Sequence, residues 1–190
     1  MEEATAVRDM LFVTADDYLL DSFRLAKKIR DSGYRPNYMV GVWRGGTPPG
    51  IAVHEYLDYY GIKTDHVPIK TEGYVGIEKI GREIKVYGLE YLVNHCNADD
   101  SLLIVEDIFD KGLSINAIIQ ELIKRCRRNM PETKLASVYF KPKSNQTSRI
   151  PDFYIHETSK WVVFPHELKG LTKEEIRLKG KEIADIVLAD

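Results

Sequence analysis

The sequence is poor in cysteine, in excess charge and in long hydrophobic runs. Only two of its 190 residues are cysteines. Cys96 and Cys126 fit no CxxC or metal-binding spacing, so we expect two reduced thiols. The formal net charge is −2 and the pI is about 6.2, which favours neither a nucleic-acid-binding surface nor a membrane surface. No run approaches the roughly 20 apolar residues that span a bilayer, and the N-terminus lacks a signal core. We therefore expect a cytoplasmic protein.

Strand-like and helix-like segments alternate along most of the chain. Short apolar runs predict strands at residues 10–13, 38–42, 64–69, 102–105, 135–140, 153–156 and 161–164. Helices are expected at 16–33, 51–60, 87–95 and 113–128, and a single helix after the capping-box sequence that begins at Thr172. This alternation favours an α/β fold with a central, mostly parallel sheet flanked by helices. No repeat or linker is visible, so we expect one domain over residues 1–190, with a small lobe from the C-terminal strands and a helical extension at 172–190.

The stretch Ser101–Ser114, SLLIVEDIFDKGLS, holds a dense group of candidate ligand-binding residues. Its apolar run predicts a strand buried on both faces, which stops at the adjacent acids Glu106 and Asp107. Asp110 and Gly112 follow, and a helical pattern begins directly after them. Ligands of α/β proteins bind at the carboxyl ends of strands. Because a helix N-terminus suits a phosphate and carboxylates suit a metal or sugar hydroxyls, we expect both kinds of ligand here.

The segment VEDIFDKGLS in this stretch resembles the 5-phosphoribosyl-1-pyrophosphate (PRPP) binding motif of the type I phosphoribosyltransferases. That motif has four apolar residues, two acids, two mostly apolar residues and then Asp-Thr-Gly-x-Thr/Ser. The resemblance implies that Glu106 and Asp107 hold the ribose hydroxyls, directly or through Mg²⁺, and that Asp110 is the general base. It also implies a 5′-phosphate site made of Asp110, Lys111, Gly112, Leu113 and Ser114. Lys111 departs from the motif, because it puts a cation where a hydroxyl is common.

A second candidate site is the segment WRGGTPPG at 43–50, which its glycines and prolines predict to be a loop. A glycine turn with one arginine is, by itself, more typical of an ordinary loop than of a binding site. Beside the PRPP motif, however, it resembles the family's pyrophosphate loop, which often contains a non-proline cis peptide bond. The resemblance implies that Arg44 neutralises the pyrophosphate and that Gly45 and Gly46 let backbone N–H groups approach its oxygens.

Residues 70–82, KTEGYVGIEKIGR, break the alternation with three glycines and several charges. Their composition alone is typical of a surface hairpin. In a phosphoribosyltransferase, their position resembles that of the mobile hood that closes over the active site. Closure would exclude water from a cationic sugar transition state.

The segments after residue 135 resemble the base pocket of the purine enzymes in this family. Lys141 matches the lysine that donates to the purine 6-oxo group, and Trp161 matches the aromatic residue that stacks on the base. Val162 would contribute backbone groups to the ring edge, and Glu167 would reach the metal–pyrophosphate region or the ring 2-substituent. The run WVVFPHEL resembles that of the xanthine-guanine and archaeal-type purine enzymes, although His166 replaces a common tryptophan.

The resemblance covers roughly residues 15–168 and is closest to the 6-oxopurine phosphoribosyltransferases. It implies Mg²⁺-dependent transfer of phosphoribose from PRPP to hypoxanthine, guanine or xanthine, as in purine salvage. The products would be a nucleoside 5′-monophosphate and pyrophosphate, and the family is commonly a homodimer or homotetramer. Two alternatives remain open: an enzyme for adenine or a pyrimidine, which Lys141 disfavours, and a non-catalytic sensor of PRPP or nucleotides with the same fold. Such a sensor usually carries a nucleic-acid-binding module, and none is evident.

Overall fold

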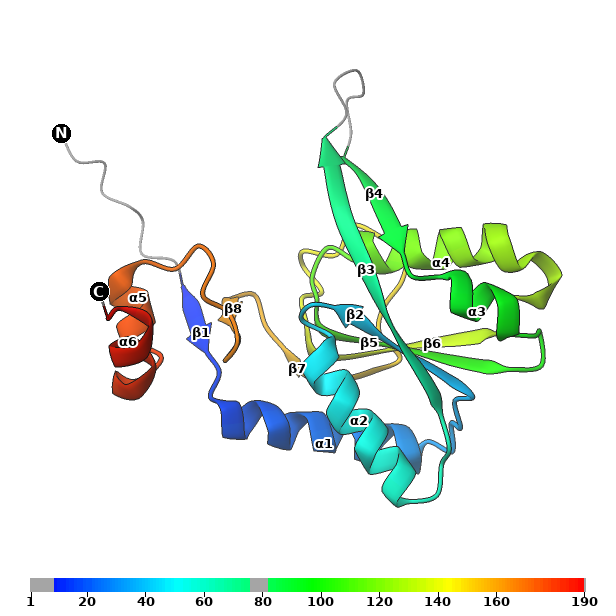
Figure 1. The fold of residues 1–190 in the computed structure, drawn as a ribbon, viewed down its shortest axis with the longest axis horizontal. Coiled ribbons are helices and arrows are strands. Elements are labelled where there is room, and N and C mark those ends of the chain that lie inside the picture. The colour runs from blue at the N-terminus through cyan, green and yellow to red at the C-terminus, as the bar shows by residue number, and fades with distance from the viewer. Residues whose placement is uncertain (1–8, 76–81, 190) are drawn as a thin grey trace. The chain divides into compact units, whose positions relative to one another are not determined.

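The computed structural model describes residues 9–75 and 82–189, and its chain forms two compact units. The larger unit is Asp21–Ser159, and the smaller one combines Met1–Leu20 with Lys160–Asp190. We describe the two units separately (Figure 1). That the whole chain acts as one phosphoribosyltransferase domain stays a prediction.

The larger unit is built on one six-stranded sheet in the order β4-β3-β2-β5-β6-β7. Every neighbouring pair is parallel except β3 and β4. This confirms the central, mostly parallel sheet. The chain leaves β2 toward β3 on one side and later returns to place β5 on the other side, so the connections reverse between β2 and β5. The strands are β2 (Tyr38–Trp43), β3 (Asp65–Val75), β4 (Arg82–Tyr87), β5 (Ser101–Phe109), β6 (Glu132–Phe140) and β7 (Phe153–Glu157).

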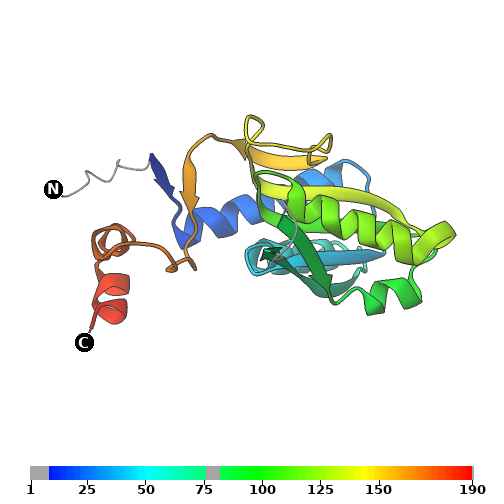
Figure 2. The same cartoon turned by 90° about the horizontal axis from the view of Figure 1, so that it is seen from above.

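Helices pack on both faces of this sheet, which explains why its central strands read as continuous apolar runs. Side chains of β2 and β5 alternate between the faces. Val40 and Ile104 belong to the core cluster beneath α3 (Glu90–His95) and α4 (Leu113–Cys126), and α4 lies along the sheet in Figures 1 and 2. The next residues, such as Leu103, are buried on the opposite face, where α2 contacts β2 and β5.

The smaller unit pairs β1 (Met10–Phe12) in parallel with β8 (Trp161–Val163). It also contains the first residues of α1 (Ala15–Asp31), and the rings of Tyr18 and Phe164 lie 5.1 Å apart. These contacts join the N-terminal and C-terminal segments within the smaller unit.

The C-terminal extension forms two helices, α5 (Lys173–Arg177) and α6 (Lys181–Val187). The capping box is confirmed, since Thr172 accepts from the Glu175 N–H and Glu175 bonds back to the Thr172 N–H. The single helix expected after Thr172 is wrong, because Gly180 adopts a φ of 119° between the two.

Several predicted element boundaries also differ from the structure, among them those of α2 and β5. Helix α2 (Thr47–Tyr59) starts four residues before the predicted position, because Pro48 and Pro49 occupy its first turn, where a missing N–H breaks no helical hydrogen bond. Strand β5 does not stop at the acidic pair but runs on to Phe109, because β6 continues beside it and pairs with it as far as Phe140.

The predicted hood or surface hairpin is a hairpin in its described part. Strands β3 and β4 pair antiparallel from Lys70↔Tyr87 to Val75↔Arg82 and project beyond the other strands (Figure 1). Residues 76–81 of that prediction lie outside the described residues, and closure over a site stays a prediction. Among the described residues, no helix is long and apolar enough to cross a membrane.

Candidate active site

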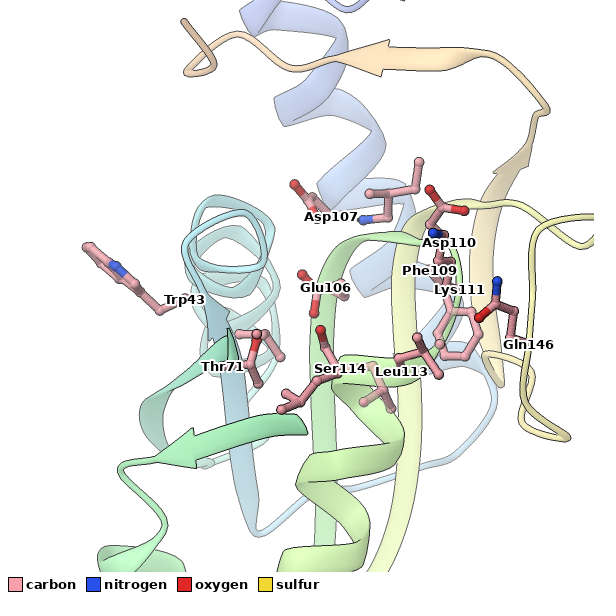
Figure 3. A pocket seen from close by; sticks show the side chains of 16 residues that line it. Trp43, Thr71, Glu106, Asp107, Phe109, Asp110, Lys111, Leu113, Ser114 and Gln146 are labelled. Carbon is pink, nitrogen blue, oxygen red and sulfur yellow. Dashed lines mark hydrogen bonds between the residues drawn. The ribbon is translucent and has the colours of Figure 1, made fainter. Parts of the chain in front are cut away.

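A cavity of about 700 Å³ lies at the carboxyl end of β5, beside the end of β2. These strands are parallel neighbours, with Gly41 opposite Val105, so the loops that follow them leave the same edge of the sheet. This edge is also where the strand connections reverse, which is the usual ligand position in open α/β sheets. The cavity is lined by Val42, Trp43, Thr71, Gly73, Ile84, Glu106, Asp107, Ile108, Phe109, Asp110, Lys111, Gly112, Leu113, Ser114, Ile115 and Gln146 (Figure 3).

The two adjacent acids both line this cavity. Burial raises the pKa of Glu106 well above its ordinary value, and the charge and hydrogen bond of Asp107 raise it further. Asp107 is itself buried, and its Oδ1 accepts a hydrogen bond of 2.7 Å from the Ile108 N–H. Two carboxyl groups so close together favour a ligand that brings a cation or hydroxyl donors.

The loop from Asp110 to Gly112 leads into α4, and Gly112 occupies the N-cap position with a φ of 74°. A Cβ at Gly112 would lie 2.7 Å from Thr147 Oγ1 and 2.9 Å from the Phe109 ring. Only glycine satisfies both the backbone angle and this space. No side chain caps the helix, so the first N–H groups of α4 are available to a ligand in the cavity. The positive end of the helix dipole lies at the same place.

The loop after β2 lies directly against β5. The peptide bond between Trp43 and Arg44 is cis, as the resemblance implied. A Cβ at Gly45 would lie 2.7 Å from Asp107 Oδ1 and closer still to Oδ2, and one at Gly46 would lie 2.9 Å from the Val42 nitrogen. The paired glycines therefore allow this loop to pass beside the acidic pair. Arg44 is exposed and does not line the cavity.

Lys141 lies at the end of β6 and contacts the loop after β5. Its backbone N–H donates to Phe109 O at 2.9 Å, and its Nζ lies 3.4 Å from Asp110 Oδ2. The side chain of Lys141 is only 9% exposed and that of Asp110 is 39% exposed. The structure thus pairs the residue predicted to bind the base with the residue predicted to remove its proton.

The other residues predicted to bind the base belong to the smaller unit. Trp161 is 52% exposed and pairs with Met10, whereas Val162 is buried. Glu167 Oε2 accepts a hydrogen bond from the Phe164 N–H at 3.2 Å, so this carboxylate also holds the turn after β8. A base site that combines these three residues with Lys141 stays a prediction.

Several residues that line the cavity were not singled out by the sequence, among them Trp43, Thr71 and Gln146. Trp43 directly precedes Arg44, and its position at the loop was a usable signal. Thr71 lies in the hairpin that was predicted to be the hood, whereas Gln146 lies in a polar loop after β6, where nothing local indicates a site.

The acids also allow a test of the predicted Mg²⁺. Among residues 9–75 and 82–189, no group of three or more His, Cys, Asp or Glu side chains is placed to hold a metal ion. Mg²⁺ commonly binds through only one or two carboxylates plus substrate oxygens and water. Glu106 and Asp107 provide two carboxyl groups at the cavity, so the residues present fit a metal that arrives with its substrate.

Comparisons with known proteins agree with this layout. A purine phosphoribosyltransferase from Pyrococcus horikoshii Ot3 is 29% identical, with a TM-score of 0.70 over 86% of this chain and 98% of that one. A hypothetical protein from Neisseria gonorrhoeae with bound ppGpp is 20% identical, with a TM-score of 0.70 over 92% and 97%. The Helicobacter pylori xanthine-guanine-hypoxanthine phosphoribosyltransferase is 19% identical, with a TM-score of 0.64 over 90% and 96%. The last two share the fold.

A family model described as the phosphoribosyl transferase domain matches residues 16–170. That range contains the acidic pair Glu106–Asp107, the loop from Asp110 to Gly112, the cis-peptide loop and Lys141. The chain therefore belongs to the phosphoribosyl transferase domain family and is a phosphoribosyltransferase.

Proposed function

We propose that the protein transfers the phosphoribosyl group of PRPP to a 6-oxopurine base: hypoxanthine, guanine or xanthine. The bond from the anomeric carbon to pyrophosphate breaks, the bond to the purine N9 forms, and the base loses a proton. The observation that carries this proposal is the contact of 3.4 Å between Lys141 and Asp110 at the cavity. It supplies a cation for a 6-oxo group and a carboxylate for the proton of the attacking base. The 29% identity to a purine phosphoribosyltransferase supports the substrate class.

Asp110 is proposed as the general base. Its carboxylate would accept the purine proton and stabilise positive charge that develops on the ribose. Lys141 is nearly buried at the end of β6, so a hydrogen bond from its ammonium to a 6-oxo group would form in a dry environment, where it is strong. The same ammonium would oppose the 6-amino group of adenine, because both are donors.

Glu106 and Asp107 are proposed to hold the ribose 2′ and 3′ hydroxyls and Mg²⁺. When bound, the metal would neutralise charge on the leaving pyrophosphate. The raised pKa of Glu106 favours its protonated form in the free protein. Binding of a cation there would therefore release a proton.

The two ends of PRPP are assigned to two backbone loops. The 5′-phosphate would bind the N–H groups at the start of α4, with Lys111, Gly112, Leu113 and Ser114 as its cradle. Pyrophosphate would bind the loop after β2, where Arg44 is exposed and Gly45 lies beside Asp107. These two loops flank the acidic pair, so the ribose would lie between them.

The remaining assignments extend the same proposal. Trp161 would stack on the base, Val162 would bond its edge through the backbone, and Glu167 would approach the 2-substituent or the metal. We further propose a homodimer or homotetramer that acts in purine salvage in the cytoplasm.

An assay with PRPP, Mg²⁺ and each base tests the function, and absence of turnover with every purine would refute it. Lys141→Ala tests the role assigned to Lys141 in its contact with Asp110. Loss of a hydrogen bond to a charged donor corresponds to roughly 1.5–3 kcal/mol, so kcat/KM for the 6-oxopurine should fall about 10- to 150-fold while KM for PRPP changes little. Lys143→Ala, two residues on and exposed, is the matched control. Equal losses for base and PRPP would contradict the role assigned to Lys141.

A further inference from the structure

The loop that follows Lys141 is fastened to the segment that starts α4. The Gln146 N–H donates to Lys111 O at 3.1 Å. Asn145 holds the loop in shape, because its Oδ1 accepts from the Thr147 N–H at 2.9 Å and its Nδ2 donates to Arg149 O at 2.7 Å. The loop is therefore internally bonded and tied to the phosphate segment, rather than a free connection.

A second set of contacts joins the loop to α4 itself. Arg149 Nε lies 3.5 Å from Oδ1 of Asn116, in the first turn of α4. Thr147 also lies over Gly112, where an added Cβ would approach its Oγ1 to 2.7 Å. Residues 144–149 are thus held against the start of α4, and Gln146 is the residue among them that lines the cavity.

Gln146 is the residue that this loop presents to the cavity. Its side chain is exposed and lines the cavity together with Lys111 and Gly112 (Figure 3). Within the part of the chain that the structure describes, its amide group makes no hydrogen bond. The amide therefore has two N–H donors available to a ligand.

The place of Gln146 relative to β5 indicates which part of PRPP its side chain would contact. A strand rises about 3.3 Å per residue, so Phe109, at the end of β5, lies roughly 10 Å beyond Glu106. Gln146 is bonded to Lys111, two residues further on. Its side chain is thus close to the helix N-terminus and far from the acids proposed to bind the ribose.

We infer that Gln146 is a further ligand of the 5′-phosphate, with its amide nitrogen donating to a phosphate oxygen. The inference rests on the proposed function and deepens it by adding a residue to the phosphate site. It also bears on the departure of Lys111 from the related motif, which commonly has a hydroxyl donor at that position. Gln146 would supply a neutral donor beside it in place of that hydroxyl.

Substitutions of Gln146 by residues of opposite charge test the inference, because they should change KM for PRPP in opposite directions. Gln146→Glu should raise KM for PRPP roughly tenfold or more, because a carboxylate would face the phosphate. Gln146→Ala should raise it several-fold, and Gln146→Lys should leave it unchanged or lower it. KM for the purine base should stay within about twofold in all three. Gln120, an exposed glutamine on α4 outside the cavity lining, provides the matched controls Gln120→Glu and Gln120→Lys.

Calorimetric titration of each variant with ribose 5-phosphate separates this inference from the proposed function. Weaker binding by Gln146→Glu than by Gln120→Glu supports the phosphate contact even if no purine is turned over. Equal affinity in all variants, or no ribose 5-phosphate binding by the wild type, would overturn it. So would a rise in KM for the base with unchanged KM for PRPP, because the glutamine would then contact the base.

Discussion

Substitution of Gly45 by alanine should separate activity from stability. The added Cβ would lie 2.7 Å from Asp107 Oδ1 and closer still to Oδ2, whereas ordinary contact begins at 3.4 Å. The loop is packed against β5, so the Asp107 carboxylate has to retreat by roughly 1 Å or more. A misplacement of about 1 Å at a reacting centre can lower the rate on the order of 100-fold. We therefore expect kcat/KM for PRPP to fall about 100-fold.

The stability of this variant should change much less. Only the end of one side chain has to move, so the overpacking penalty should lie near the low end of about 1–3 kcal/mol. For a chain of this size that corresponds to a fall in Tm of roughly 2–4 °C per kcal/mol. At Gly46 the added Cβ would instead meet the backbone of Val42 and β5. Gly46→Ala should consequently destabilise the fold itself.

Steady-state kinetics with varied PRPP and a thermal melt of each variant measure both effects. Gly50→Ala is the control, because this glycine lies within α2 and its added Cβ would meet nothing closer than 3.5 Å. It should keep wild-type activity and gain up to about 1 kcal/mol of stability from the helix propensity of alanine. If Gly45→Ala retained wild-type kcat/KM, the assigned position of Asp107 beside the substrate would be wrong.

Two predictions concern the titration of buried groups. Burial raises the pKa of Cys96 to about 12, so only about one Cys96 thiol in ten thousand is a thiolate at pH 8. The folded protein should therefore not react with Ellman's reagent within minutes, whereas both cysteines should react in guanidinium. Rapid reaction of the native protein would contradict the burial. The raised pKa of Glu106 means that its contribution to stability is complete below the ordinary pKa of a glutamate and is lost as pH rises through the raised value. Glu106→Gln should therefore have a higher urea midpoint than wild type at pH 8 without Mg²⁺ and an equal one at pH 4, and equal midpoints at both pH values would refute the shift.

The elements that sequence patterns predicted well are those whose signal is local. Apolar runs predicted the central strands because both faces of a parallel sheet are covered by helices. Their ends were less well predicted, since the extension of β5 past Glu106 depends on its pairing with β6. The start of α2 was missed because prolines suggest a loop by composition but are tolerated in the first turn of a helix.

The meeting of Asp110 and Lys141 shows what local patterns leave open. The two residues are 31 positions apart, and each alone is typical of a solvated charge. The register of two parallel strands brings them together. Phe109 pairs with Phe140 at the ends of β5 and β6, and Asp110 and Lys141 are the residues that directly follow. The loop with Gln146 is placed by the same register together with its bonds to Lys111 and α4.

The sequence by itself determined the α/β class and the order of acids, glycine and helix start in VEDIFDKGLS, because these depend on neighbouring residues and on the periods of strand and helix. Only the tertiary structure decided which side chains share the cavity, the fit of Gly45 against Asp107, and the place of Gln146 beside the start of α4. Those features depend on strand register and on atomic distances between segments far apart in the chain, which no local pattern contains.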